Sequence, residues 1–432
     1  MLDIKVLRSD PEAVRAAARK KRLPDRVAAV DRALAVDAEL RELTPQLDGM
    51  RSEQKTAGKQ LGKLSPEERE RVLAVQKELK ARLQGLEERE KQLRQELDEQ
   101  LALVPNLCDD DVPDGKDDTE NVETKRHGEV PKFGFAPRPH YEIGEAQGWI
   151  DFQRAAALAG SRNYVLMGDL ALLQDAALRF AIDHMVAQGF VPVDPPVLVR
   201  DAAMRGTGFF PGGEEQTYRC EKDELNLIGT SEVPVTSLHS GEILDEADLP
   251  KRYVARSMCF RREAGTYGKD TRGLYRVHQF QKVEQVVVDI GDRERSLQHH
   301  QAIVANAEAC LQAFELPYRI VAVCGGDLGV PQAFKYDIET WMPSREAFGE
   351  THSASRFYDY QARRLSLRYR ATSGPMAGKV QFCHTLNNTV IASPRILIPL
   401  LENHQNQDGT VRVPAALRPY LGGREQLGKP VF

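Results

Sequence analysis

The sequence has few cysteines, and none has the spacing of a metal site. Its six cysteines lie far apart in 432 residues, and no two form a Cys-x-x-Cys pair. No apolar run approaches the ~18 residues of a membrane helix, and Asp3 places a charge where a secretory leader would be apolar. These absences exclude a disulfide scaffold and a membrane protein. We expect a cytoplasmic protein with reduced thiols and no zinc.

Two common glycine-rich phosphate motifs, Gly-x-Gly-x-x-Gly and Gly-x-x-x-x-Gly-Lys-Ser/Thr, are also absent, so any nucleotide site must be built in another way. Hydrophobic residues make up 41% and charged residues 28% of the chain, a balance typical of globular proteins. The net charge of -5 argues against a general polyanion binder but leaves room for local basic surfaces.

Aromatic residues are missing from residues 26 to about 104, where leucines recur in heptads instead. Ser65 is a suitable helix N-cap and Pro66 a suitable first helical residue between two heptad runs. The pattern predicts an antiparallel coiled-coil hairpin with helices of roughly 38 residues each, in which Pro45 kinks the outgoing helix. The apolar seam positions are Leu40, Leu43, Leu47, Met50, Leu79, Leu83, Leu86, Leu93 and Leu97.

A basic stripe lies near the tip of the expected hairpin. Arg51, Lys55 and Lys59 are spaced by four and therefore share one helical face. Such a stripe is either a solvated face or a surface that follows nucleic-acid phosphates, and the residues alone leave both open.

Composition divides the chain into three parts. Residues 1–104 form an N-terminal domain that contains the hairpin, and residues 105–123, rich in aspartate, are expected to be a linker without regular structure. Residues 124–432 mix short β-like runs with irregularly placed helical stretches, which favours an α+β fold with an antiparallel sheet flanked by helices.

The densest group of chemically useful residues lies at 260–284. Phe260-Arg261-Arg262-Glu263 precedes a glycine-rich cationic loop with Lys269 and Arg272, and a second strand-like run carries Phe280 and Glu284. Arg261 and Glu263 should share one face of the first strand, as should Phe280 and Glu284 on the second. An arginine, a carboxylate and an aromatic ring together suit an adenine nucleotide, although a surface hairpin with ion pairs has the same residue types.

This pattern resembles motif 2 of the class II aminoacyl-tRNA synthetases. Gly189–Pro196 is similar to motif 1, with Pro196 at a dimer interface, and Pro394-Arg395 is similar to motif 3. With Thr230-Ser231-Glu232, Glu350-Thr351-His352-Ser353 and the hairpin, the chain resembles the bacterial seryl-tRNA synthetases from end to end. The implied fold is the class II antiparallel sheet preceded by the coiled-coil domain.

The resemblance implies the residues of an ATP site. Arg261 and Arg395 take the catalytic positions, Arg261 between the amino-acid carboxylate and the α-phosphate and Arg395 at the γ-phosphate. Glu350 and Ser353 match ligands of Mg²⁺ bound with ATP, and no zinc is expected. We expect a structural role for His278 rather than that of a general base, whereas His352 is either structural or, beside the ATP-binding carboxylate of Glu350, part of the ATP site. The full ATP set implied is Arg261, Arg262, Glu263, Val277, Phe280, Glu350, Thr351, His352, Ser353 and Arg395.

The resemblance also implies the amino acid, the tRNA and a homodimer. The serine set is Thr230, Ser231, Glu232, Arg261, Glu284, Asn387 and Thr389. Arg51, Lys55, Lys59, Lys269 and Arg272 become tRNA contacts, with the hairpin on the long variable arm of the serine tRNA and the loop at the acceptor end. The implied reaction forms seryl-adenylate and charges the serine tRNA, and the selenocysteine tRNA where one exists. A carrier-protein-charging or non-catalytic relative of the same fold is the alternative.

Overall fold

The structure is a computed structural model that describes residues 1–60, 65–265 and 272–432. The chain divides into two compact units, Met1–Pro105 and Asn106–Phe432. Among the described helices, none combines the length and the apolar character needed to cross a membrane.

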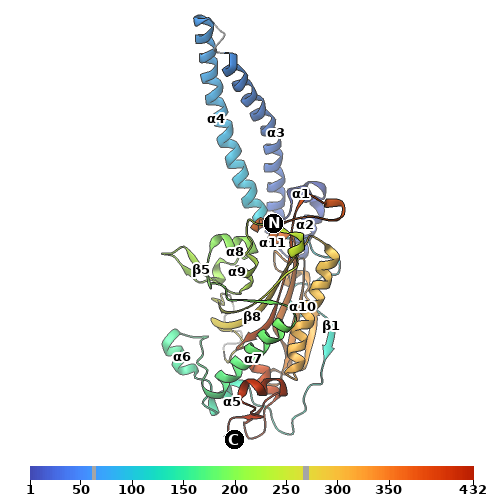
Figure 1. Cartoon of the computed structure of the whole chain (residues 1–432). Coiled ribbons are helices and arrows are strands. Elements are labelled where there is room, and N and C mark those ends of the chain that lie inside the picture. Colours follow the sequence, from blue (N-terminus) through green and yellow to red (C-terminus); the bar gives the residue numbers. More distant parts are fainter. Residues whose placement is uncertain (61–64, 266–271) are drawn as a thin grey trace. The chain divides into compact units, whose positions relative to one another are not determined.

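The first unit is a helical hairpin with two short helices before it. Helices α1 (Ile4–Ser9) and α2 (Pro11–Lys20) precede the long helices α3 (Pro24–Gln60) and α4 (Pro66–Leu103), which run antiparallel (Figure 1). Leu40, Leu43, Leu47, Leu83 and Leu93 are buried between α3 and α4, which confirms the predicted seam. The Ser65 hydroxyl accepts from the Glu68 amide while the Glu68 carboxylate accepts from the Ser65 amide, so a capping box starts α4 at the predicted residue.

Pro45 lies inside α3, whose helical bounds continue past it to Gln60.

The second unit is built on one large mixed sheet. Its described strands follow the order β1-β9-β10-β11-β14-β8-β7-β2 and are antiparallel except for the parallel pair β2–β7. The antiparallel α+β prediction is therefore confirmed. The bounds are β1 (Val122–His127), β2 (Val191–Val193), β7 (Lys251–Phe260), β8 (Gln279–Asp289), β9 (Tyr318–Ala322), β10 (Phe334–Met342), β11 (Ala347–Tyr358) and β14 (His384–Ser393).

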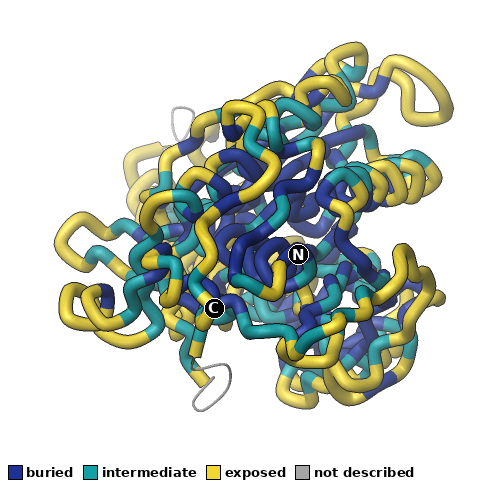
Figure 2. The backbone as a smooth tube through the Cα atoms, turned by 90° about the horizontal axis from the view of Figure 1, so that it is seen from below, coloured by how far each residue is buried: buried dark blue, intermediate teal, exposed yellow. Residues whose placement is uncertain are grey.

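Side-chain alternation gives the sheet two different faces. Helices α7 (Gly168–Ala187) and α10 (Arg293–Ala313) cover one face, where Val283 and Val287 of β8 join the main core. On the other face, Val286 and Val288 pack in a second cluster with α9 (Glu232–Thr236) and α11 (Tyr360–Leu365). The same face carries Phe280, Lys282 and Glu284 farther along β8. Figure 2 shows the buried interior surrounded by exposed loops.

Smaller elements complete the second unit. The remaining helices are α5 (His140–Ala146), α6 (Phe152–Ala159), α8 (Asp201–Thr207) and α12 (Leu397–Asn403). The described residues also form three small sheets. One contains β3 (Leu198–Arg200), β5 (Leu225–Leu227) and β4 (Arg219–Cys220), and a second contains β13 (Val380–Phe382), β12 (Arg368–Arg370) and β6 (Ile243–Asp245). The third is the pair β15 (Val411–Arg412) and β16 (Gln426–Leu427).

The acidic segment corrects the expectation of a linker at 105–123. Residues from Asn106 onward belong to the second unit, and Asp109 is 95% buried. Asp109 accepts from Arg356 Nε at 3.0 Å and from the Tyr358 hydroxyl at 2.9 Å, and it pairs with Arg293. The acidic composition suggested a solvent-exposed segment. Its burial could not be predicted, because the arginines that bind Asp109 lie about 180–250 residues away in sequence.

Candidate active site

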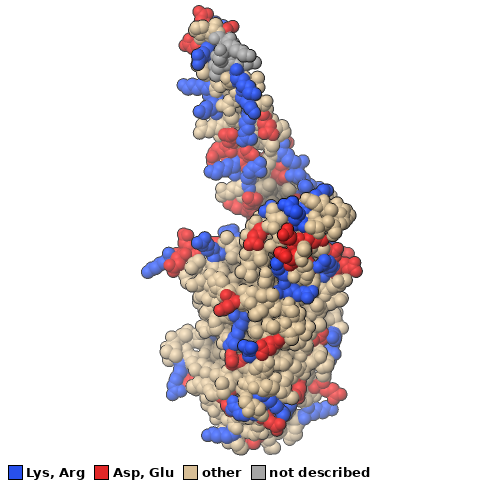
Figure 3. Space-filling view, viewed as in Figure 1, with Lys and Arg blue, Asp and Glu red and all other residues tan. Residues whose placement is uncertain are grey.

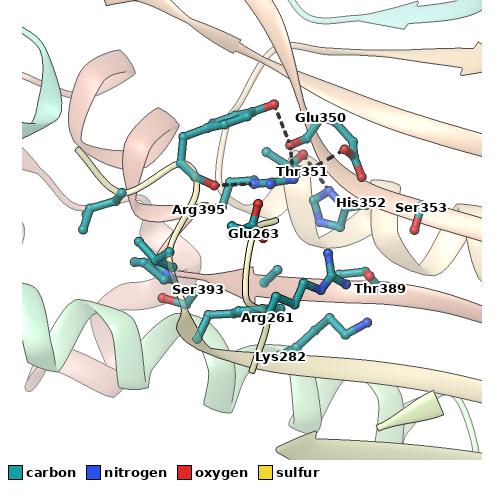
Figure 4. A pocket seen from close by; sticks show the side chains of 16 residues that line it. Arg261, Glu263, Lys282, Glu350, Thr351, His352, Ser353, Thr389, Ser393 and Arg395 are labelled. Carbon is teal, nitrogen blue, oxygen red and sulfur yellow. Dashed lines mark hydrogen bonds and ion pairs between the residues drawn. The ribbon is translucent and has the colours of Figure 1, made fainter. Parts of the chain in front are cut away.

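A pocket opens on the sheet face that carries Phe280 and Lys282 (Figure 4). It encloses about 560 Å³, open mouth included, and its walls come from β8, β11, β14 and the residues beside them. The structure brings together ten residues that the sequence pointed to, namely Arg261, Glu263, Val277, Phe280, Glu350, Thr351, His352, Ser353, Thr389 and Arg395.

One wall is an arginine held between backbone carbonyls. Arg395 Nε donates to the Tyr275 carbonyl at 3.2 Å, and its Nη1 donates to the Glu350 carbonyl at 3.0 Å. Nη1 also lies 3.5 Å from the Glu350 carboxylate, and the guanidinium stacks over the Tyr275 ring (Figure 4). The guanidinium is therefore fixed in orientation, with its charge at the pocket surface.

Glu350 is ionised by its surroundings. Partial desolvation raises the pKa of this carboxyl, but the positive charges of Arg395, Lys335 and Arg261 outweigh that effect and hold it below its usual value. The side chain is 47% exposed and lines the pocket together with Ser353.

The oxygens at this wall suit a hard cation. Glu350 and Ser353 offer a carboxylate and a hydroxyl, the ligand types that Mg²⁺ prefers. Asp337 lies directly opposite Ser353 in the β10–β11 ladder, and its buried Oδ1 has no hydrogen-bond partner among the described residues. The donor set therefore fits a divalent ion that also binds phosphate oxygens. No cluster of three or more His, Cys, Asp or Glu side chains able to hold a metal occurs within the described ranges.

Arg261 and Phe280 form the opposite wall. The Arg261 guanidinium lies 5.2 Å from the centre of the Phe280 ring, and Nε donates to the Gly229 carbonyl at 3.3 Å. Strand β7 ends at Phe260, so the prediction that Arg261 and Glu263 share a strand face is wrong. Glu263 instead has a φ of +54°, which turns the chain so that its carboxylate approaches Arg276 at 3.7 Å.

A buried polar group adjoins the floor of the pocket. Glu284 is 99% buried, and its carboxylate accepts from Asn387 Nδ2 at 2.9 Å and from Thr389 Oγ1 at 3.3 Å. Lys282, which lines the pocket, has its Nζ 2.5 Å from Glu284 Oε2. A small ligand with a hydroxyl and a charged amine would find both acceptors and donors here.

Glu232 adds a second buried carboxyl beside Glu284. Burial and the negative charge of Glu284 raise its pKa to about 7, against hydrogen bonds from Gln361 and Asn387. Thr230 Oγ1 accepts from the Glu232 amide at 3.1 Å, and the Ser231 hydroxyl is buried without a hydrogen-bond partner among the described residues. Of these three residues, Glu232 lies within electrostatic reach of Glu284, and Ser231 supplies a buried hydroxyl without a partner among the described residues.

Both domains match known family models. Residues 1–108 match the seryl-tRNA synthetase N-terminal domain, and residues 217–404 match the tRNA synthetase class II core domain (G, H, P, S and T). A serine--tRNA ligase of Deinococcus radiodurans is 49% identical over 431 residues, with 100% of each chain covered, and one of Rhodococcus opacus is 45% identical over 423 residues, with 98% of this chain and 99% of its own covered. The chain belongs to the seryl-tRNA synthetases.

A solved structure agrees over the whole length. The crystal structure of seryl-tRNA synthetase from Pyrococcus horikoshii complexed with ATP has a TM-score of 0.93 and 39% identity, with 99% of each chain covered. This chain is thus a class II synthetase and a ligase, and nothing in these matches favours the carrier-protein or non-catalytic alternative. The class II core also implies a divalent-metal requirement with ATP.

Two histidines near the pocket of this synthetase have structural partners. The His278 ring lies 3.0 Å from the Arg261 carbonyl. Burial lowers the pKa of His352 to about 4, and its Nδ1 lies 2.7 Å from Thr351 Oγ1, which also contacts Thr340 at 2.7 Å. A neutral imidazole at pH 7 suits a structural role for His352, and the contact with the Arg261 carbonyl suits one for His278.

The pocket of the synthetase also contains residues that the sequence analysis missed. Lys282 shares a strand face with Phe280 and Glu284 because it lies two residues from each, and that spacing could have identified it. Tyr275 had no comparable signal. Arg262, in contrast, is not among the residues that line the pocket, and its guanidinium lies 5.9 Å from the centre of the Tyr218 ring. The lining residues not predicted are Leu274, Tyr275, Lys282, Ala392, Ser393 and Pro394.

A buried histidine anchors the segment that carries Tyr275. His140 Nε2 accepts from the Leu274 amide at 3.1 Å, and Nδ1 donates to Glu402 Oε1 at 2.8 Å. Gly273 has a φ of +90°, and a Cβ there would lie 2.4 Å from His140 Nε2, so the close approach requires glycine. Gly273 and Leu274 of the synthetase are thus held against α5 and α12.

The basic residues proposed for tRNA have different surroundings. Arg51 pairs with Glu87 at 3.1 Å and Glu90 at 3.6 Å across the hairpin, whereas Lys55 and Lys59 are exposed and have no ion-pair partner among the described residues. Figure 3 shows basic and acidic side chains interspersed along the visible face of the hairpin. Arg272 stacks 4.2 Å over the Tyr141 ring, and Lys269 lies outside the described residues.

Proposed function

We propose that the pocket forms seryl-adenylate from serine and ATP. A carboxylate oxygen of serine attacks the α-phosphorus, a new phosphorus–oxygen bond forms, and the bond to the oxygen shared with the β-phosphate breaks to release pyrophosphate. The observation that best supports this is that Arg261 lines one pocket with Lys282 and Thr389, which contact Glu284, and with Glu350 and Arg395.

The proposed catalysis is positioning and charge stabilisation without a protein nucleophile. Arg261 holds the serine carboxylate against the α-phosphate, and Arg395 neutralises the γ-phosphate as pyrophosphate leaves. Adenine stacks on Phe280, while Glu263 and the backbone of Val277 bind its edge. Glu350 and Ser353 would hold Mg²⁺, which would supply charge neutralisation on the phosphates.

Serine is proposed to bind over the buried carboxyls. Its hydroxyl donates to Glu284, beside Thr389 and Asn387, and its ammonium group lies near Thr230 and Glu232. Burying polar groups that need a hydroxyl partner excludes alanine, because alanine leaves them unsatisfied. This arrangement accounts for selection of an amino acid that differs from alanine by one oxygen.

The second proposed step charges the serine tRNA, and the selenocysteine tRNA where one exists. A hydroxyl of the terminal ribose attacks the serine carbonyl carbon, AMP leaves, and the hydroxyl proton goes to AMP. Lys55 and Lys59 contact phosphates of the long variable arm, while Lys269 and Arg272 lie beside the acceptor end. Arg51 contributes less to tRNA binding because Glu87 and Glu90 already bind its charge.

A homodimer is proposed through the edge of the large sheet. Three apolar side chains on β2 and on the elements that flank it in sequence are exposed, namely Val191 of β2 at 55%, Val186 of α7 at 46% and Leu198 of β3, in the neighbouring small sheet, at 41%. Pro196 lies between the two strands and is exposed as well. Burying this patch against a second copy removes apolar surface from water. We place the enzyme in the cytoplasm.

Amino-acid-dependent exchange of pyrophosphate into ATP tests this function. We expect exchange with serine and at least 10³-fold less with alanine, in line with the roughly 10⁴-fold discrimination of sites that pair a substrate hydroxyl. Threonine and glycine serve as further controls of pocket size. Exchange that depends on another amino acid, or no exchange with any, contradicts the proposal.

A further inference from the structure

Lys282 is a buried cation that the reaction scheme above leaves without a role. Its side chain is 7% exposed, and it lines the pocket on the sheet face that carries Phe280 and Glu284. A buried lysine is rare, because an ammonium group removed from water must be paired to avoid a large desolvation cost. Here the paired atom is Glu284 Oε2, 2.5 Å away.

The hydrogen bonds to Glu284 leave it one open acceptor position. An ionised carboxylate accepts at about four lone-pair positions. Asn387 occupies one on Oε1, at 2.9 Å, while Lys282 and Thr389 occupy two on Oε2, at 2.5 and 3.3 Å. The remaining position matches a single hydroxyl donor from a small ligand.

Lys282 supplies one of two cations among the four charged groups at the proposed serine end of the pocket. Glu232 and Glu284 contribute two carboxyls, and Arg261 and Lys282 contribute two cations. With Glu232 ionised, the protein groups sum to zero, which suits serine, a zwitterion with no net charge. Without Lys282, Glu284 would lose the ammonium group that lies 2.5 Å from its Oε2 and would be left buried beside a second carboxyl.

Figure 4 shows Lys282 and Arg261 extending in the same direction, toward Thr389. Lys282 is therefore placed to act on Glu284, at the proposed serine end of the pocket.

We propose that Lys282 is a specificity-determining residue, which pairs with Glu284 and fixes the orientation of its carboxylate, so that the pocket requires a hydroxyl donor. The inference rests on the proposed serine pocket. It predicts that Lys282 governs the discrimination between serine and alanine and leaves ATP binding unchanged.

The test replaces Lys282 by methionine and measures pyrophosphate exchange with serine and with alanine. Lys282→Met should lower kcat/KM for serine about 100-fold or more, lower it for alanine less than tenfold, and leave KM for ATP within twofold. Lys251→Met is the matched control, since Lys251 lies on neighbouring β7, pairs with Asp248 at 3.6 Å, and is remote from the pocket lining. It should leave the serine-to-alanine ratio unchanged.

Two further variants keep the result decisive. Lys282→Gln keeps a hydrogen-bond donor beside Glu284 but removes the charge, so its loss of kcat/KM for serine should be smaller than that of Lys282→Met. If Lys282→Met does not fold, the serine-to-alanine ratio is measured in Lys282→Gln instead. Glu284→Gln tests the pocket itself. The ratio compared is kcat/KM for serine over kcat/KM for alanine. If it stays within twofold of wild type in the Lys282 variants but falls in Glu284→Gln, the role of Lys282 is overturned and the serine pocket stands. An unchanged ratio in Glu284→Gln overturns the pocket, and the Lys282 proposal with it.

Discussion

Tyr275 fixes the position of Arg395. The guanidinium carbon of Arg395 lies 4.3 Å from the centre of the Tyr275 ring, and its Nε donates to the Tyr275 carbonyl. The Tyr275 hydroxyl donates to the Glu350 carbonyl at 3.3 Å, the same oxygen that Arg395 Nη1 contacts. These contacts hold the cation in place before ATP binds, which is the condition for strong electrostatic stabilisation of leaving pyrophosphate.

Arg395→Ala should therefore lower the rate of adenylate formation by about 10²–10³-fold, the typical loss when one preorganised donor is removed. Tyr275→Phe is the matched control, because it keeps the ring and the carbonyl that bind Arg395 and removes only the hydroxyl. It should lose less than tenfold. Single-turnover formation of seryl-adenylate measures both, and a rate for Arg395→Ala within tenfold of wild type would contradict the assignment.

Glu284→Ala should abolish serine activation while ATP still binds. The change removes the hydroxyl acceptor and leaves Lys282 as an uncompensated buried cation, whereas the lining at Phe280 and Arg395 stays intact. Serine-dependent exchange and calorimetric titration with ATP report the two effects separately. Glu294→Ala, an exposed acid on α10, is the control. Unchanged serine kinetics in Glu284→Ala would remove the serine assignment.

The pKa of about 7 for Glu232 predicts that serine binding improves as the pH rises through neutrality. The ionised carboxylate attracts the serine ammonium group, whereas the protonated carboxyl does not. KM for serine should fall from pH 6 to pH 8 in the wild type, and the pH dependence should flatten in Glu232→Gln. A wild-type KM that is constant over this range would contradict the role of Glu232.

Glu232 also makes the folded protein less stable as the pH rises. Between pH 4.5 and 7 the unfolded chain releases the Glu232 proton while the folded protein keeps it, so stability falls by about 3 kcal/mol over this window. Glu232→Gln removes this loss and should be more stable than wild type at pH 8 but not at pH 5. Urea unfolding followed by the fluorescence of Trp149 and Trp341, both in the second unit, measures the difference.

Asp109→Ala should destabilise the second unit by about 3–5 kcal/mol, because it leaves Arg356, which is 97% buried, without its carboxylate. Asp110→Ala is the matched control, since Asp110 is the exposed neighbour. Tryptophan fluorescence in urea again reports the transition. Equal stability of the two variants would show that the acidic segment does not support the fold.

Replacing Lys55 and Lys59 together by alanine should weaken tRNA charging and leave amino-acid activation unchanged. Each lysine that contacts a phosphate contributes about one to the slope of the logarithm of the tRNA association constant against the logarithm of the salt concentration. The double variant should therefore lower the magnitude of this slope by about 2. The control replaces Lys77 and Lys80, two exposed lysines on α4. Identical kcat/KM for tRNA in both double variants would contradict a specific role for Lys55 and Lys59.

The sequence predicted what depends on short-range pattern. The seam around Leu40 and Leu93, the cap at Ser65 and the alternation of Phe280 and Glu284 are all confirmed, because helix and strand periods fix which residues share a face.

What the sequence could not predict depends on partners distant in the chain or on backbone turns. Asp109 is buried by Arg356, 247 residues away, and Glu263 leaves the strand through a positive φ. Tyr275 carries no motif signal, and its importance follows from its contact with Arg395, 120 residues away. Such contacts arise only when the sheet assembles.

The measurement that tests the central claim most directly is the charging of unfractionated bacterial tRNA with a panel of labelled amino acids, with ATP and Mg²⁺ present. We predict label in tRNA from serine alone, which requires the pocket at Glu284 and the tRNA-binding surface to work in one protein. Activation of serine without transfer to any tRNA would contradict the second proposed step. Label from another amino acid, or none at all, would contradict the account as a whole.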